Sequence, residues 1–288
     1  MLGFALPACT PPPLRPKAAN PFADPQNLSV ERLAELVEDK DPEIRAQAAY
    51  HLRGQGSDPA AAVLLIGGLQ DSHAEVRAAA ASSIEALGDG THLKSAAPAL
   101  VKALSDSSPK VRSMAALALG KIQSPEGPAA LVLLLKDQDR MARWAASVAL
   151  GKSGAAGVPE LSRALWDKDP LVRLGALQAL SFMGKDAVAA VPSLAQKLSD
   201  EDPSVRAAAC GALASVGEGA AEAALPALGK LAGDGEPSVR LAAVRSLPRL
   251  AHAGFTAEAV ALLKRFLSDK SPEVRAAAQE GLGSLPSR

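Results

Sequence analysis

The chain has 288 residues, which is enough for one or two ordinary domains or for one elongated array of repeats. Its 31 lysine and arginine residues balance its 31 aspartate and glutamate residues, so it lacks the net positive charge that favours nucleic-acid or anionic-membrane partners. Aromatic residues make up only 3% of the chain and hydrophobic residues 48%, so the apolar mass is Ala, Leu and Val, which favours closely packed helices over a β-sandwich.

The first 27 residues are rich in proline and do not share the pattern of the remaining chain. We expect residues 1–27 to form a disordered tail or an extended tether, because such a composition cannot build a core. Leu6-Pro7-Ala8-Cys9 resembles a bacterial lipobox with Cys9 as the lipidated residue, although Pro7 and the short stretch before Cys9 depart from that pattern. We therefore expect a cytoplasmic protein. The alternative is an envelope lipoprotein anchored through Cys9, with a start upstream of Met1, and only this alternative involves a membrane.

From residue 28 onward, one seven-residue phrase recurs eight times at intervals of 30 to 35 residues. Each copy begins with Asp and ends with Arg, and six copies have Pro three residues before the Arg. The eight pairs are Asp39 and Arg45, Asp71 and Arg77, Asp106 and Arg112, Asp137 and Arg143, Asp167 and Arg173, Asp200 and Arg206, Asp234 and Arg240, and Asp269 and Arg275.

A helix is predicted after each phrase, because apolar residues then recur at helical spacing. The third residue after every Arg is Ala, which indicates a close approach of two helices, and the seventh is Leu or Ile. Residues such as Asp41 and Ser108 are expected N-caps before a Pro at the first helical position, and Gly88 and Gly217 are expected left-handed C-caps. A second apolar segment, such as Ala97 to Asp106, completes each repeat as a helical hairpin that needs its neighbours to bury both faces.

The phrase Asp-x-x-Pro-x-Val-Arg, preceded by Pro-x-Leu-x-x-x-Leu, resembles the short HEAT-like repeat of phycobilisome lyases. This resemblance covers residues 28–288. It implies an all-α fold, an α-α superhelical solenoid of about eight HEAT-type helical hairpins, with residues 28–288 as one repeat domain. A shared fold does not fix a shared function.

The eight arginines have two interpretations. They could form an anion-binding row, or they could form a structural ladder in which each Arg pairs with the Asp six residues earlier or with the Asp of the adjacent repeat. One Asp for each Arg leaves no net charge for a ligand. We therefore expect the ladder.

No residue pattern points to catalysis. The histidines His51, His73, His92 and His252 are dispersed, and none is followed by Glu as in the iron sites of deoxyhypusine hydroxylase, an enzyme of similar repeat fold. Cys210 is expected to be a small buried thiol. We expect no catalytic residue, no metal site, no cofactor and no enzymatic activity.

The second helix of each hairpin lines the concave face of HEAT solenoids, and positions one, five and eight after the Arg are expected to project from it. In the central repeats these positions include Leu117, Trp144, Val148 and Leu174 with Gln178, and toward both ends they become polar, as in a protein-binding surface. We predict a non-enzymatic scaffold that binds a protein or peptide there; the alternatives are that Trp144 packs against a neighbouring helix, or that the protein is a bilin lyase-like enzyme accessory or chaperone. The expected partner-binding residues are Leu117, Trp144, Val148, Leu174 and Gln178.

Overall fold

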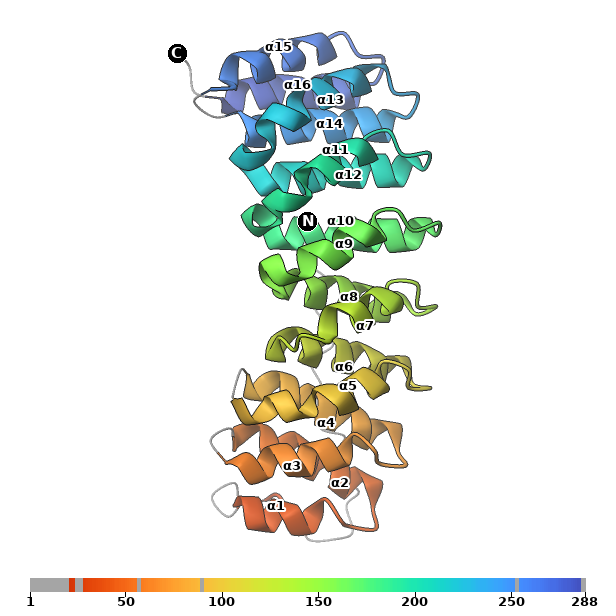
Figure 1. Cartoon of the computed structure of the whole chain (residues 1–288), viewed down its shortest axis with the longest axis vertical. Helices are drawn as coiled ribbons and strands as arrows, with labels where there is room; N and C mark the ends of the chain where they lie inside the picture. The colour runs from red at the N-terminus through yellow and green to blue at the C-terminus, as the bar shows by residue number, and fades with distance from the viewer. Residues whose placement is uncertain (1–20, 24–27, 56–57, 89–90, 252–253, 286–288) are drawn as a thin grey trace. The chain divides into compact units, whose positions relative to one another are not determined.

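The computed structural model describes residues 21–23, 28–55, 58–88, 91–251 and 254–285. In these ranges the chain forms α-helices and short 3-10 helices, without a β-strand (Figure 1). Its internal contacts group into a first unit, Met1–Ala149, and a second unit, Leu150–Arg288. The boundary falls inside helix α8.

In each unit, consecutive helices pair as hairpins, and the even-numbered helices stack on one another in one layer. In the first unit α4 packs between α2 and α6, and in the second unit α12 packs between α10 and α14, with α16 following α14. The odd-numbered helices are α1 (Val30–Leu36), α3 (Pro59–Gly68), α5 (Ala97–Ala103), α7 (Gly127–Leu134), α9 (Val158–Ala164), α11 (Val191–Lys197), α13 (Ala221–Lys230) and α15 (Thr256–Phe266). The even-numbered helices are α2 (Pro42–His51), α4 (Ala74–Leu87), α6 (Pro109–Ile122), α8 (Arg140–Lys152), α10 (Pro170–Met183), α12 (Pro203–Val216), α14 (Pro237–Leu250) and α16 (Pro272–Ser284).

Short 3-10 helices connect several of these hairpins. They are η2 (Leu52–Gly54), η3 (Thr91–Ala96), η4 (Gly154–Gly157), η5 (Gly184–Ala190), η6 (Gly217–Ala220) and η7 (Leu231–Gly233).

The even helices begin and end where the sequence indicates. The Asp41 carboxylate accepts a hydrogen bond from the Glu43 N–H at 2.9 Å, while Ser108 is the N-cap of α6 without such a side-chain bond. Gly88 and Gly217 follow their helices with φ of 89° and 73°, so the expected positive φ is confirmed. Their ψ values of −141° and −134° differ from a left-handed helical cap, and this backbone region is open essentially to glycine alone.

The core consists of the small and aliphatic residues that recur in each repeat. The Ala three residues after each ladder Arg is fully buried in every repeat, which fits the predicted close approach of helices. These residues are Ala48, Ala80, Ala115, Ala146, Ala176, Ala209, Ala243 and Ala278. The predicted fold class, an all-α, α-α superhelical solenoid of HEAT-type hairpins, is confirmed.

Residues 21–23 contact the first hairpin. Phe22 is only 7% exposed, and its ring stacks on His51 with the ring centroids 5.0 Å apart. The two stacked rings place Phe22 against α2, while most of the segment predicted as a tail or tether lies outside the described residues. Cys9 lies outside the described residues. Among the described helices, none combines the length and apolar character of a membrane span.

Candidate functional site

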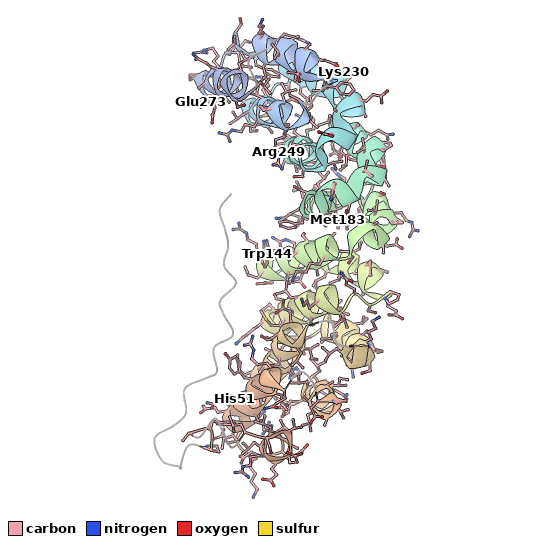
Figure 2. The ribbon with its side chains drawn as sticks, turned by 90° about the vertical axis from the view of Figure 1, so that its left-hand side faces the viewer. His51, Trp144, Met183, Lys230, Arg249 and Glu273 are labelled. Carbon is pink, nitrogen blue, oxygen red and sulfur yellow. The ribbon has the colours of Figure 1, made fainter. Side chains whose placement is uncertain are left out.

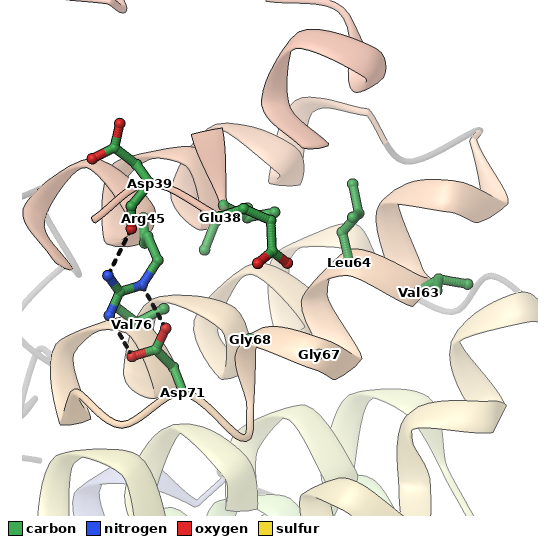
Figure 3. Close-up of a pocket in the computed structure, with 11 residues that line it drawn as sticks. Glu38, Asp39, Arg45, Val63, Leu64, Gly67, Gly68, Asp71 and Val76 are labelled. Atoms are coloured by element: carbon green, nitrogen blue, oxygen red, sulfur yellow. Dashed lines mark hydrogen bonds and ion pairs between the residues drawn. The ribbon is translucent and has the colours of Figure 1, made fainter. Parts of the chain in front are cut away.

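The ladder arginines join neighbouring repeats. Arg45 Nε donates to Asp71 Oδ2 at 2.7 Å and Arg45 Nη2 donates to Asp71 Oδ1 at 2.9 Å, while Arg45 Nη1 donates to the Asp39 carbonyl oxygen at 2.8 Å (Figure 3). Such a bidentate pair is among the stronger side-chain interactions in proteins. The same arrangement recurs at Arg77 with Asp106, Arg112 with Asp137, Arg206 with Asp234 and Arg240 with Asp269.

Each of these five guanidinium groups therefore contacts two repeats. Its Nη1 donates to the main-chain carbonyl of the Asp six residues earlier, and its Nε and Nη2 bind the carboxylate of the following repeat. Arg143 and Arg275 make the same bond to the carbonyls of Asp137 and Asp269, at 2.7 Å each. Of the two pairings that the sequence allows, the side-chain pairing is thus with the next repeat.

The ladder arginine of α10, Arg173, varies this arrangement. Arg173 Nη2 donates to Asp200 Oδ1 at 2.8 Å, and Nη1 donates to the Asp167 carbonyl oxygen at 3.0 Å. The other carboxylate oxygen, Asp200 Oδ2, accepts a hydrogen bond from Lys197 Nζ at 3.3 Å. Arg173 Nε is therefore buried without a partner in the described part of the chain. The Lys197 ammonium also lies 3.7 Å from the centroid of the Trp166 ring, a cation–π contact.

The ladder pairs line cavities between successive repeats. A cavity of about 490 Å³ is bordered by Glu38, Arg45, Val63, Gly67 and Asp71 (Figure 3). The guanidinium beside this cavity already binds the Asp71 carboxylate and the carbonyls of Asp39 and Lys40, and it lies 3.3 Å from His73 Nδ1. Its donors are directed at the protein itself, so the cavity does not present this charge to an anion.

The ladder carboxylates make the fold sensitive to acid. Hydrogen bonds from Arg45, Arg77 and Arg240 hold the pKa of Asp71, Asp106 and Asp269 below the ordinary value of 3.8. A carboxyl with a lowered pKa stabilises the folded state above its ordinary pKa, and this stabilisation is lost as the pH falls through the folded-state value.

We expect the free energy of unfolding, measured by urea denaturation, to fall steeply as the pH drops below 3.8. The Arg240→Ala variant should show a smaller drop between pH values of about 5 and about 2.5, because Asp269 then titrates nearer its ordinary pKa. Equal drops in both proteins would contradict this origin of the acid sensitivity.

Two even helices carry apolar residues on the side opposite their buried stripe. On α8, Met141, Trp144 and Val148 follow one another at i, i+3 and i+7, and all three are half-buried. Trp144 belongs to the layer of even-numbered helices (Figure 2). We call these three residues the α8 stripe. An apolar row on a second helix face, in addition to the core-facing one, is typical of a partner-binding helix.

Helix α10 carries the equivalent row, which we call the α10 stripe. It consists of Leu171, Leu174, Gln178 and Phe182 at i, i+3, i+7 and i+11. Leu171 is 43% and Phe182 52% exposed, Gln178 is exposed and Leu174 is half-buried. The equivalent positions of α12 hold Ser204, Ala207 and Gly211, which are polar or small.

One expected surface residue is buried. Leu117 is only 5% exposed, so its prediction as a partner-binding residue is wrong. One turn further along α6, at Gly120, a Cβ would be 2.5 Å from Ala149 Cα of α8, so the two helices lie in close contact there.

Sequence reasoning missed Leu171 and Phe182. Position eight after Arg173 was expected to project, whereas the exposed side chain is at position nine, Phe182. The i, i+3, i+7, i+11 spacing from Leu171 would have identified both residues. A Cβ added at Gly151 would lie 2.6 Å from the Cβ of Phe182. The absence of a side chain at Gly151 therefore leaves room for Phe182.

Cys210 is fully buried, and burial raises the pKa of its thiol to about 12. A thiol in this state is neither a nucleophile nor a metal ligand near neutral pH. In the described part of the chain, no three His, Cys, Asp or Glu side chains are grouped to hold a metal ion. The side chains of His92 and His252 lie outside that part.

Stacked helical hairpins, joined within each unit by Arg–Asp pairs between neighbouring repeats, define the class of α-solenoid repeat proteins. HEAT repeats match residues 18–85, 65–151, 127–191 and 225–287, and a further HEAT repeat matches residues 190–220. The chain belongs to the HEAT-repeat family.

Solved structures with the same fold include importin beta, which has a TM-score of 0.66 and 14% identity over 88% of this chain and 41% of the importin chain. Kap95p gives a TM-score of 0.63 and 15% identity over 88% of this chain and 40% of its own. Human deoxyhypusine hydroxylase is 24% identical over 88% of this chain and 95% of its own, with a TM-score of only 0.38. Among curated proteins, none matches the chain.

Proposed function

We propose that this protein is a non-enzymatic scaffold that binds a protein or peptide on its concave face, the face of the even-numbered helices. The observation that carries the proposal is the outer row of α8 and α10, which combines Trp144 with the exposed Leu171 and Phe182, whereas the equivalent positions of α4, α12 and α16 are polar or small. Trp, together with Tyr and Arg, is enriched among the residues that contribute most to binding at protein interfaces.

The remaining features of the chain support this proposal. The ladder guanidinium groups are engaged within the array, and Cys210 is buried in a form without nucleophilic character. Kap95p, a solenoid of similar fold, is described as binding RanGDP. A partner would bury the half-exposed side chains of the α8 stripe against its own apolar residues, which removes apolar surface from water and favours association.

A double variant of the α8 stripe, Trp144→Ala with Val148→Asp, tests the proposal. Both side chains are only half-buried, so we expect the variant to keep its helicity and to lose its partner. The measurement is affinity capture from native lysate followed by mass spectrometry, after circular dichroism has shown that the variant folds.

The matched control changes the same two helix positions on α14, as Leu241→Ala with Arg245→Asp. The proposal expects a protein that wild type and this control capture, and that the α8 variant loses. Identical captured proteins from all three would place the binding surface elsewhere. Unfolding of the α8 variant alone would show instead that Trp144 belongs to the core.

A further inference from the structure

A cavity of about 650 Å³ lies in the second unit, between the α13–α14 hairpin and the α15–α16 hairpin. It is bordered by the turn around Asp234, which leads into α14, by the turn around Asp269, which leads into α16, and by Arg265 of α15. Pockets that bind small ligands commonly have volumes of roughly 300–1,000 Å³. The cavity is therefore large enough for a small ligand or for one side chain of a partner.

The turn around Asp234 leaves this space open, because it carries few side-chain atoms. Ala232, Gly233 and Gly235 flank this Asp, whereas the other seven repeats have Leu or Val two residues before the ladder Asp and no glycine on either side of it. A Cβ at Gly233 or Gly235 would meet nothing within 4 Å, and neither glycine has a positive φ. Neither helix packing nor backbone conformation requires these glycines, and the space that side chains would fill stays accessible to a ligand.

The ladder holds both turns in place. Arg240 Nη1 donates to the carbonyl oxygens of Asp234 and Gly235 at 2.9 and 3.3 Å, and its Nε and Nη2 bind the Asp269 carboxylate. The Asp234 carboxylate is bound in the same way by Arg206, through Nε at 2.8 Å and Nη2 at 2.9 Å. The two carboxylates that border the cavity are therefore already paired with arginines of the ladder.

Two further cations border the cavity without such partners. Arg265 and Lys270 are exposed, and no carboxylate of the described residues forms an ion pair with either side chain. Arg265 Nη1 would lie 3.6 Å from a Cβ at Gly229 of α13, so this guanidinium extends from α15 toward the preceding hairpin. Glu236 belongs to the first of the two turns but is not among the residues that line the cavity. Since both bordering carboxylates are paired, Arg265 and Lys270 give the cavity an excess of positive charge.

Two other cavities beside ladder arginines do not share this charge. The cavity beside Arg45 is bordered by the carboxylates of Glu38, Asp39 and Asp71 and by no cation other than Arg45. The cavity beside Arg112 is bordered by two cations and two carboxylates. Among these three cavities, an excess of cations is therefore particular to the one between α14 and α16.

We propose that this cavity binds the phosphoryl group of a phosphate monoester, and we call it the phosphate site. A phosphate monoester carries a charge of about −1.5 to −2 near neutral pH, which matches the two cations without carboxylate partners. The Arg265 guanidinium offers a fork of N–H groups that binds two phosphate oxygens at once, and the Lys270 ammonium supplies a second positive charge. The monoester is either a free small molecule or a phosphorylated side chain of a protein. The phosphate site contains no residue of the α8 or α10 stripe, so its test is independent of the proposed scaffold surface.

The proposal is tested by NMR titration of protein labelled with ¹⁵N at glycine, in which the amides of Gly233 and Gly235 report from the wall of the phosphate site. Inorganic phosphate and a short phosphoserine peptide are each added from about 0.1 to about 20 mM at constant ionic strength, a range that covers weak binding. We expect both amide signals to shift and to saturate with either probe, and to stay unchanged with the unphosphorylated peptide. A dissociation constant at least about 10-fold lower for the peptide than for phosphate would assign the site to a protein partner. A smaller difference would assign it to a free phosphate compound.

The double variant Arg265→Gln with Lys270→Gln should raise the dissociation constant for phosphate at least about 10-fold, because both charges that face the ligand are removed. Lys264→Gln is the matched control, since it removes an exposed cation of α15 that does not border the cavity, and it should bind phosphate like the wild type. Circular dichroism establishes that each variant is folded. A wild type whose Gly233 and Gly235 signals do not shift would overturn the proposal. It would also be overturned by a double variant that binds as tightly as the wild type, or by a control that loses as much affinity as the double variant.

Discussion

The Arg240→Ala variant should lose about 3 kcal/mol of unfolding free energy. The Arg240 side chain is 10% exposed and that of Asp269 only 5%, and Nε and Nη2 bind the carboxylate at 2.7 and 2.9 Å. Removal of the guanidinium leaves a buried carboxylate whose remaining hydrogen bond comes from the Ser271 N–H. It also releases the carbonyls of Asp234 and Gly235. Urea denaturation followed by circular dichroism measures the loss.

The matched control is Arg275→Ala in the last repeat. This arginine makes the same two carbonyl bonds but has no carboxylate partner among the described residues, so its removal should cost less than about 1 kcal/mol. The difference between the losses of unfolding free energy in the two variants gives the contribution of the Arg–Asp ion pair between repeats. Equal losses would mean that the carbonyl bonds alone stabilise the array.

The Gly120→Ala variant is expected to show the second large loss of stability. A Cβ there would lie 2.5 Å from Ala149 Cα and 2.7 Å from Ala149 Cβ, and main-chain atoms cannot move aside as a flexible side chain can. Gly120→Ala should therefore separate α6 from α8 and cost about 1–3 kcal/mol, the usual penalty of overpacking. Thermal unfolding of the variant gives the size of this cost.

Gly211→Ala is the control, because Gly211 also lies inside an even helix, α12, but has nothing within 4 Å of its Cβ position. Ala favours the helix over Gly by about 0.5–1 kcal/mol, so this variant should be more stable than the wild type. A loss of stability in Gly120→Ala and a gain in Gly211→Ala would show that contact with the neighbouring helix decides how this substitution affects stability. A gain in stability at both sites would contradict the close approach at Gly120.

Much of the fold could be predicted from local rules. Asp41 and Pro42 specify a helix start, and the Ala three residues after each Arg specifies a buried contact, because both depend on residues within one helix turn. The 3-10 helices, such as η5 (Gly184–Ala190), were not predicted, because they depend on how the preceding hairpin meets the next. The ψ of Gly88 likewise depends on that connection.

The candidate site was less predictable, because exposure depends on the distance between helices. Leu117 and Val148 occupy the same position after their ladder Arg, yet Leu117 is buried and Val148 is half-buried. The sequence shows which residues share a helix face, and the spacing between helices decides whether that face meets solvent or a neighbour. The partner of Arg45 was ambiguous for a similar reason, since one guanidinium reaches its own repeat and the next at once.

The ladder also makes the repeats interchangeable as building blocks. In most repeats the ladder Asp binds the arginine of the preceding repeat and the ladder Arg binds the carboxylate of the following one, so duplication of such a repeat brings a matching Asp and Arg to both new junctions. Deletion of a whole repeat likewise rejoins a matching Arg and Asp, as long as the cut respects the period. The number of repeats can therefore change by recombination within the gene without new mutations at the junctions, and the length of the surface available to a partner can vary with few structural constraints.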